Sequence, residues 1–286
     1  MKNSVFEVLK AASQRLSDAH IDNPRLDAEI LLAHVINCRR LSLYVDSDKK
    51  LPLDTIFRFN ELINQRLEGV PVAYLINSKD FMGLSFAVNQ NVLIPRPETE
   101  ILTELVGEYL RGLGGDVTFA DLGTGSGAIA ISILKFVKSA RASAVDISSE
   151  ALEVAKFNAT KFHVEDRIEL LQGDLFEPLQ GKIFNAIVSN PPYIPTADLE
   201  TLQSEVKKEP RLALDGGQDG LSFYRRIISS APRFLVSGGL LAVEIGINQA
   251  SAVKILFEAA NFIDVEILKD LSGIDRIVLG KKVLEV

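Results

Sequence analysis

Apolar residues in the first part of the chain recur at helical spacing. A first set would share one face of a helix: Val5, Leu9, Ala12 and Leu16. A later set would share the face of another: Ile56, Phe59, Ile63 and Leu67. Between the two sets, Asn23 and Pro24 suit a helix start, because proline is favoured at the first helical position. The pattern ends at Gly69, and it predicts a helical bundle over residues 1–69.

After Gly69 the apolar positions no longer follow the helical period. The short runs VAYLI, LSFAV and NVLI are β-like and are separated by turn-forming residues. They predict a β-hairpin linker over residues 70–95. A helix should then begin near Pro97, with acidic residues in its first turn, where the helix dipole favours them.

From Val117 to the end, strand-like and helix-like segments alternate within a third region, residues 96–286. The strand-like runs are VTFADLG, ASAVDI, IELLQGDLF, IFNAIVSN, GLLAVEIG, VEILKDL and RIVLGKK. Such alternation predicts an α/β fold with a parallel, doubly wound, Rossmann-like sheet of seven strands. Only SGID separates the last two runs, which is too short for a crossover helix, so they should form an antiparallel hairpin at the sheet edge.

Composition and charge narrow the class of protein. The chain has 286 residues and a single cysteine, Cys38, so it forms no internal disulfide and suits a reducing compartment. We see neither a signal peptide nor a charge-free apolar run of membrane length, so we expect a cytoplasmic protein that does not enter a membrane. One cysteine and three scattered histidines give no metal-ligand spacing.

The net charge of −7 is unevenly distributed. Residues 1–90 contain 11 basic and 11 acidic side chains, so the whole negative charge lies on residues 91–286. Tight nucleic-acid binding usually requires a cluster of Lys and Arg, and this chain has no such run. We therefore expect no direct nucleic-acid partner.

The segment DLGTGSGAIA follows the first strand of the predicted sheet. Its glycine loop consists of Gly123, Thr124, Gly125, Ser126 and Gly127, and glycines let the backbone turn sharply and approach a ligand. With Ala128 the segment fits the dinucleotide pattern G-x-G-x-x-A. Asp146, at the end of the second strand, is placed to bind a ribose diol. A nicotinamide cofactor and S-adenosylmethionine explain these residues equally well.

A third acidic residue favours S-adenosylmethionine. Asp174 follows the third strand, and ligands of parallel sheets bind at the carboxyl ends of the strands. Asp121, Asp146 and Asp174 should therefore form an acidic rim. Such a rim suits a cationic sulfonium and not a pyrophosphate.

The fourth strand ends in SNPPYIP, which predicts a site for a planar NH2 group. The Asn190 side-chain oxygen and the Pro191 carbonyl could accept the two N–H hydrogens and stabilise the positive charge that develops when the nitrogen is methylated. Pro191 and Pro192 would keep the loop rigid, and Tyr193 offers a flat face for stacking.

Together these motifs closely resemble the release factor glutamine methyltransferases, the PrmC or HemK family. The matching pieces are VLIPRPETE, DLGTGSGAIAI, AVDIS, GDLF, SNPPYIP, EPRLALDGGQDGLSFYR, VEIG and LSGIDRIVLGK. The resemblance implies S-adenosylmethionine as methyl donor and, as acceptor, the glutamine of the Gly-Gly-Gln motif of peptide-chain release factors. It implies that the glycine loop and Asp146 hold the cofactor, that Asp174 and Leu175 border its adenine, and that Asn190 to Tyr193 hold the glutamine amide. Leu175 stands where some members have an aromatic residue, and Asn77 stands where a glycine is expected.

Other interpretations remain open at this point. NPPY also occurs in adenine methyltransferases that act on DNA or RNA, and a binding module could retain the fold without the reaction. Arg96, Glu98 and Thr99 either line the cleft or simply begin a helix. Gly216-Gly217-Gln218 mimics the substrate motif, but a turn is the simpler interpretation. We expect the N-terminal bundle to recognise the protein substrate, and the protein to be a monomer.

Overall fold

The computed structural model describes residues 3–284 and divides the chain into two compact units. The first comprises the chain up to Ser78 together with Gln203–Lys208, and the second comprises Lys79–Leu202 and the chain from Glu209 onward. The chain therefore passes between the units three times, once near the start of the hairpin and twice around residues 203–208.

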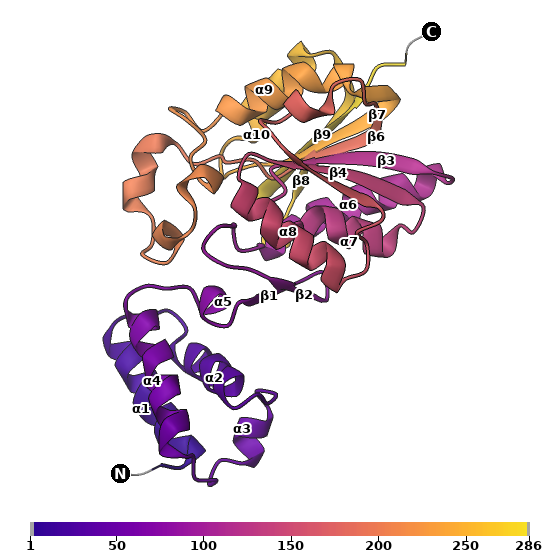
Figure 1. Ribbon diagram of the computed structural model, residues 1–286. Coiled ribbons are helices and arrows are strands. Elements are labelled where there is room, and N and C mark those ends of the chain that lie inside the picture. The colour runs from indigo at the N-terminus through magenta and orange to yellow at the C-terminus, as the bar shows by residue number, and fades with distance from the viewer. Residues whose placement is uncertain (1–2, 285–286) are drawn as a thin grey trace. The chain divides into compact units, whose positions relative to one another are not determined.

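Helices form the first unit, as the sequence predicts (Figure 1). They are α1 (Val5–Asp18), α2 (Pro24–Val35), the short α3 (Ser42–Val45), α4 (Leu53–Leu67) and the short α5 (Val72–Leu75). Ser4 caps α1 in a capping box with Glu7, and α4 is followed by Gly69 at φ 85°. The core contains Leu16, Phe59 and Ile63, whereas Leu9 is only partly buried and Val8 takes the inward position.

A buried ion-pair cluster holds residues 203–208 in this unit. The Arg66 guanidinium contacts Asp27 Oδ2 at 2.7 Å and Glu205 Oε2 at 3.0 Å, and both Arg66 and Asp27 are buried. The guanidinium charge compensates the desolvation of the two carboxylates, so removing the arginine would leave buried negative charge without its partner.

The linker prediction is correct in the existence of a hairpin and wrong in two of its three runs. The strands are β1 (Ser78–Phe81) and β2 (Leu84–Ala87), joined by Met82 and Gly83, which both have positive φ. VAYL forms α5, and NVLI forms no strand. Asn77, which stands where a glycine is expected, adopts φ 52°, a conformation that asparagine tolerates better than most residues.

The second unit is built on a seven-stranded sheet, as predicted. The strands are β3 (Val117–Leu122), β4 (Ala140–Asp146), β5 (Ile168–Gln172), β6 (Phe184–Ser189), β7 (Leu235–Glu244), β8 (Phe262–Lys269) and β9 (Asp275–Lys282). Their order is β5-β4-β3-β6-β7-β9-β8, with β5, β4, β3, β6 and β7 parallel. β9 runs antiparallel between β7 and β8, so the predicted terminal hairpin is confirmed.

Helices cover both faces of this sheet (Figure 1). On one face lie α6 (Pro97–Leu113), α7 (Ala128–Phe136) and α8 (Ser149–Lys161), and on the other α9 (Ser222–Ser230) and α10 (Ala250–Ala259). Each face has its own apolar core, one around Leu102, Phe119 and Ile131, the other around Tyr224, Leu241 and Phe257. The strand order reverses between β3 and β6, and the carboxyl ends of the strands there are free to form a site.

Candidate active site

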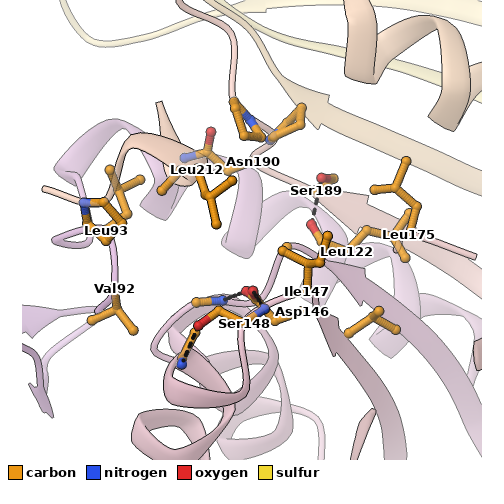
Figure 2. A pocket seen from close by; sticks show the side chains of 18 of the residues that line it. Val92, Leu93, Leu122, Asp146, Ile147, Ser148, Leu175, Ser189, Asn190 and Leu212 are labelled. Carbon is orange, nitrogen blue, oxygen red and sulfur yellow. Dashed lines mark hydrogen bonds between the residues drawn. The ribbon is translucent and has the colours of Figure 1, made fainter. Parts of the chain in front are cut away.

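A cavity of about 310 Å³ lies at the carboxyl ends of β3, β4, β5 and β6. Seven segments of the second unit line it: the chain before α6, the glycine loop, the turn after β4 with the start of α8, the turn after β5, the loop after β6, the turn at residues 210–213 and the start of α9. Figure 2 shows Asp146 and Asn190 on facing sides of this cavity, with Val92 and Leu93 at one end. Strands distant in sequence thus bring together the motifs that the sequence singled out.

The glycine loop turns sharply after β3. Gly123, Gly125 and Gly127 have φ of 73°, 55° and 79°, in the left-handed region that glycine adopts without strain. Gly123 and Gly125 line the cavity. Thr124, Ser126 and Gly127 do not line it; they shape the loop, and a Cβ on Gly127 would lie 2.8 Å from Ile131 Cδ1.

The Asp146 carboxylate joins this loop to the start of α8. Its Oδ2 accepts the Gly125 N–H at 2.8 Å and its Oδ1 accepts the Ser148 N–H at 3.0 Å. Burial raises the pKa of this carboxyl, and the backbone donors at Ser148 and Gly125 partly offset the rise. Because each carboxylate oxygen can accept a further hydrogen bond, Asp146 can still take two hydroxyl groups.

The predicted acidic rim is smaller than expected. Asp121 is fully buried and does not line the cavity; its Oδ2 accepts from Thr124 Oγ1 at 2.7 Å and from the Ala130 N–H at 3.3 Å. Burial raises its pKa to about 7. Asp174 does line the cavity, but it pairs with Arg226, which also lines it. The sequence argument was wrong here because it placed every acidic residue at a strand end in the rim. The sequence does not show that the Asp121 carboxyl points into the core or that the Asp174 carboxyl pairs with an arginine.

Apolar side chains form much of the cavity wall; the sequence argument named Leu175 among them and missed the others. Leu175, at φ 53°, faces the cavity together with Ile147 and Phe223, and Leu93 and Leu212 add to the wall (Figure 2). Ile147 follows Asp146 directly and is 54% exposed. Its position directly after Asp146 was the signal available in the sequence. Phe223 supplies an aromatic ring near Leu175, so a planar heterocycle has both aliphatic and aromatic surfaces to contact.

Asn190 is held at the cavity by three neighbouring elements. Ser189 Oγ donates to the Leu122 carbonyl at 2.7 Å, which ties the end of β6 to the end of β3 (Figure 2). Asn190 Nδ2 donates to Thr99 Oγ1 at 3.1 Å, and Thr99 Oγ1 donates to Glu244 Oε2 at 2.5 Å. Asn190 Oδ1 is shielded from solvent and has no hydrogen-bond partner within residues 3–284. The side chain therefore keeps one acceptor unused.

The rest of the NPPY segment is rigid and closely packed. Pro191 and Pro192 line the cavity, whereas Tyr193 lies beside it and packs against the second core. The Tyr193 carbonyl accepts from Gln249 Nε2 at 2.9 Å. Burial, with the nearby Glu244 charge, raises the pKa of Tyr193 to about 12, so its hydroxyl stays protonated at neutral pH.

The segment DGGQDG supports the NPPY loop from behind. The Gly216 N–H donates to the Ile194 carbonyl at 2.8 Å, and the Ile194 N–H donates to the Leu214 carbonyl at 3.0 Å. A Cβ on Gly216 would lie only 2.7 Å from Tyr193 Cα. Gln218 is exposed and lies in a turn before α9, as the simpler interpretation holds.

The RPETE stretch begins α6 and contributes to the site indirectly. Thr99 is the residue that contacts Asn190, and none of Arg96, Glu98 and Thr99 lines the cavity itself. Arg96 Nη2 instead contacts Glu209 Oε1 at 2.5 Å, and Glu209 Oε2 also accepts the Ile94 N–H. Glu244, from VEIG, is the polar residue of this region to which sequence reasoning gave no role.

Comparison with known proteins identifies the family. Two family models match, the PrmC N-terminal domain over residues 7–76 and the methyltransferase small domain over residues 99–270. A release factor glutamine methyltransferase of Caulobacter vibrioides is 43% identical over 285 residues, which is 99% of this chain and 98% of the relative. One of Moorella thermoacetica is 44% identical over 275 residues, covering 96% and 97%. The chain belongs to the release factor glutamine methyltransferase family.

The fold of this family member also occurs in more distant methyltransferases. An rRNA methyltransferase of T. thermophilus, solved in complex with AdoMet and guanosine, is 18% identical with a TM-score of 0.53, covering 72% of this chain and 49% of that one. At this identity the likeness shows a shared fold alone. Among residues 3–284, no helix is long and apolar enough to span a bilayer. The same residues contain no group of three or more His, Cys, Asp or Glu side chains that could hold a metal ion.

Proposed function

We propose that this protein transfers a methyl group from S-adenosylmethionine to the side-chain amide nitrogen of the glutamine in the Gly-Gly-Gln motif of peptide-chain release factors. The names of full-length relatives support this assignment. The observation that carries it is that Asn190 lines the cavity and that its shielded Oδ1 has no hydrogen-bond partner within residues 3–284. A buried acceptor without a partner costs free energy that an incoming N–H would recover.

The cavity fits S-adenosylmethionine. The positive-φ backbone at Gly123 and Gly125 leaves open space where side chains would otherwise stand. Asp146 would take the ribose hydroxyls, and Ile147, Leu175 and Phe223 would border the adenine, next to Asp174. Thr124, Ser126 and Gly127 would act by fixing the loop. When bound, the cofactor supplies a methyl group activated by its sulfonium charge and retains the bonding electron pair as a thioether.

Asn190 and the NPPY backbone make the amide nitrogen a better nucleophile. The lone pair of a glutamine amide is delocalised into its carbonyl, so the nitrogen alone attacks poorly. Asn190 Oδ1 and the Pro191 carbonyl would accept hydrogen bonds from the two N–H groups. These bonds stabilise the positive charge that develops as the nitrogen forms its bond to the methyl carbon. One of those hydrogens then leaves as a proton to water. Pro192 holds the loop, and Tyr193, kept neutral, offers a face beside the amide rather than a base.

The first unit, in this proposal, recruits the release factor. Its surface carries exposed apolar side chains, namely Phe6, Leu41, Tyr44, Val45, Leu53 and Phe57. A folded release factor can bury a standard interface of about 1,600 Å², and binding energy from such a remote contact can position the reacting loop. We further propose that residues 1–69 form this recognition domain, that 70–95 is a linker, and that the enzyme acts as a cytoplasmic monomer.

Mass spectrometry of a purified release factor incubated with the protein and S-adenosylmethionine tests the proposal. The expected result is one added methyl group on the glutamine of the Gly-Gly-Gln peptide, and none on a factor in which that glutamine is replaced by alanine. An unmodified glutamine under conditions where the cofactor binds would contradict the proposal. Methylation of adenine in DNA or RNA instead, with an affinity that falls steeply with salt, would favour the alternative activity.

A further inference from the structure

The three side chains of Asn190, Thr99 and Glu244 form a directed chain of hydrogen bonds behind the proposed amide site. They come from the loop after β6, the first turn of α6 and the last residue of β7. β6 and β7 are neighbouring parallel strands in which Ser189 is opposite Val243, so Asn190 and Glu244 leave the sheet side by side. Thr99 and Glu244 are 4% and 2% exposed, so water does not compete for these groups.

The direction of this chain follows from the number of donors. A threonine hydroxyl has a single hydrogen, and an ionised carboxylate can only accept. Once Thr99 donates to Glu244, its oxygen can only accept from Asn190, and the group that faces it must be the Nδ2 amide. The other end of the amide, Oδ1, is then left as an acceptor that no described residue bonds.

We propose that Glu244 and Thr99 are positioning residues that fix which end of the Asn190 amide is available to the substrate. This inference rests on the proposed function, because only an acceptor at Asn190 can bind a substrate NH2 group. With the amide rotated by half a turn, an NH2 would face the substrate NH2, and two donors would oppose each other. A rotated amide occupies nearly the same space, so sterics alone do not select the orientation.

The same logic gives a dependence on the charge of Glu244. A protonated Glu244 can donate to Thr99, and the Thr99 hydroxyl is then free to donate to Asn190 Oδ1, which stabilises the rotated amide. Burial raises the pKa of Glu244 to about 7, while Thr99, the Arg276 charge and Asn190 favour its ionised form. The titratable and polar groups that face Glu244 come from four elements: Glu98 and Thr99 on α6, Asn190 and Tyr193 on the loop after β6, Tyr224 on α9 and Arg276 on β9. The Tyr224 hydroxyl donates to the Glu244 backbone carbonyl, and Arg276 also pairs with Asp270.

Threonine variants separate orientation from packing. Thr99→Val keeps the shape and removes the hydroxyl, Thr99→Ser keeps the hydroxyl, and Thr103→Val removes a second buried hydroxyl one turn further along α6, which bonds the Thr99 carbonyl. We expect Thr99→Val to lower kcat on the release factor roughly 10–100-fold, as for other residues that orient a binding side chain. Affinity for S-adenosylhomocysteine should hardly change, and Thr99→Ser and Thr103→Val should keep kcat near the wild-type value.

Glu244→Gln tests the dependence on charge. Its Oε1 can still accept from Thr99, but the side chain no longer titrates. The wild-type kcat should fall as the pH drops through about 7, and this acid limb should be missing from Glu244→Gln. An acid limb that persists in Glu244→Gln would overturn the role of its charge, since Asp121 would then be the remaining buried carboxyl of similar pKa.

A spectroscopic measurement tests the orientation without substrate. The Asn190 side-chain NH2 resonances can be assigned by their loss in Asn190→Ala. They should shift as the pH crosses about 7 in the wild type, and should not shift with pH in Glu244→Gln. Asn190 NH2 chemical shifts that change neither with pH nor in Thr99→Val would overturn the proposal.

The outcomes distinguish this inference from the function on which it rests. Full kcat in Thr99→Val, with Asn190→Ala impaired, contradicts the positioning role and leaves the methyltransferase assignment intact. A wild-type protein that never methylates the glutamine contradicts the assignment, while the resonances still report whether the amide is oriented. Equal losses in Thr99→Ser and Thr99→Val would show that packing at Thr99 matters, and would overturn the role of its hydroxyl.

Discussion

At the scale of single residues, the proposed chemistry depends on a few polar atoms whose partners are unusually well defined. Asn190 Oδ1 has no hydrogen-bond partner among the described residues, the two Asp146 oxygens each accept one backbone N–H, and Glu244 is almost fully buried. Each of these three residues should therefore respond to substitution in a different measurement: turnover, cofactor affinity or pH-dependent stability.

Asn190→Ala should reduce kcat on a release factor by about 10²–10³-fold, by analogy with deletion of one oxyanion-hole donor. The reason is that the acceptor matters most when positive charge develops on the nitrogen. Affinity for S-adenosylhomocysteine should change much less, since the ribose and adenine contacts lie elsewhere in the cavity. Single-turnover kinetics measure the effect, and a rate near that of the wild type would exclude the proposed role.

Asp146→Ala should weaken the binding of S-adenosylhomocysteine in calorimetry. Loss of two charge-assisted hydrogen bonds, discounted for water that replaces them, corresponds to roughly 10–100-fold in affinity. The free Gly125 and Ser148 N–H groups add to the loss, because the loop is no longer tied to α8. Asp116→Ala, at an exposed position before β3, is the control and should bind normally. Equal affinity in the two variants would limit Asp146 to a turn residue.

Glu244→Gln should stabilise the protein increasingly as the pH rises. The folded pKa of about 7 lies above the ordinary glutamate value of 4.5, so the folded state holds the proton more tightly than the unfolded state. That contribution is present below pH 4.5 and is lost as the pH rises through about 7, where the wild type carries a buried charge. The difference should approach the order of 3 kcal/mol above that pH. Urea unfolding at both pH extremes measures it; a difference that does not grow with pH would contradict the shift.

At the scale of elements, the NPPY loop is shaped by segments that follow it in the sequence. Its carbonyl at Tyr193 is bonded by Gln249, and its other side packs on Gly216 and Gly220. Two prolines restrict the backbone conformation of the loop, but the neighbouring DGGQDG turn determines its position relative to the cavity. The glycines of DGGQDG are therefore explained by close backbone approach, without any role as a mimic of the substrate.

Gly216→Ala should displace the NPPY loop and lower kcat. The new Cβ would lie 2.7 Å from Tyr193 Cα, and backbone cannot move aside as cheaply as a flexible side chain. We expect a loss of about 10-fold or more, in line with small misplacements of reacting groups. Gly107→Ala, within α6 where the Cβ meets nothing within 4 Å, is the matched control and should be neutral or slightly stabilising. Activity assays with melting curves test the pair, and equal kcat values would show that the loop adapts.

At the scale of the whole molecule, the two units divide the work in the proposed function. The second holds the cavity and the motifs, while the first exposes several large apolar side chains. Charge follows the same division, because the first unit, residues 1–78 and 203–208, has 12 basic and 11 acidic side chains, and the second has the remaining 19 basic and 27 acidic ones. Recognition by apolar contact is therefore the expected mode for the first unit.

The double variant Leu53→Ser/Phe57→Ser should raise KM for an intact release factor. Both side chains lie on one face of α4 and are 65% and 64% exposed, so their loss should not unfold the unit. We expect about a 10-fold or greater effect, since apolar anchors dominate interfaces. The rate on a short Gly-Gly-Gln peptide should stay the same, because such a peptide lacks the folded surface that would contact α4. Ile255→Ser, an exposed apolar position on α10, is the control; an unchanged KM in the double variant would exclude this face as the recognition surface.

The sequence alone determined the fold class and most of the motifs. Strand–helix alternation and the short SGID connection specified the seven-stranded sheet and its terminal hairpin, because hydrophobic period and connection length are local properties. Local pattern was less reliable for VAYL and NVLI, where runs of only three or four apolar residues fit a short helix or an irregular segment as well as a strand. The glycine loop and NPPY were readable because their residue types restrict the backbone directly.

Only the tertiary structure decided which side chains share the site and how they are oriented. The Asp121 side chain is buried in the core because it lies on the inner face of a strand. Asp174 pairs with Arg226, which is more than 40 residues away in the chain. Thr99 and Glu244 meet Asn190 from positions 91 and 54 residues distant in the chain, so no spacing could reveal their contact. The direction of the hydrogen bonds among Asn190, Thr99 and Glu244 depends on all three side chains together, because which group donates is determined only when every partner is in place.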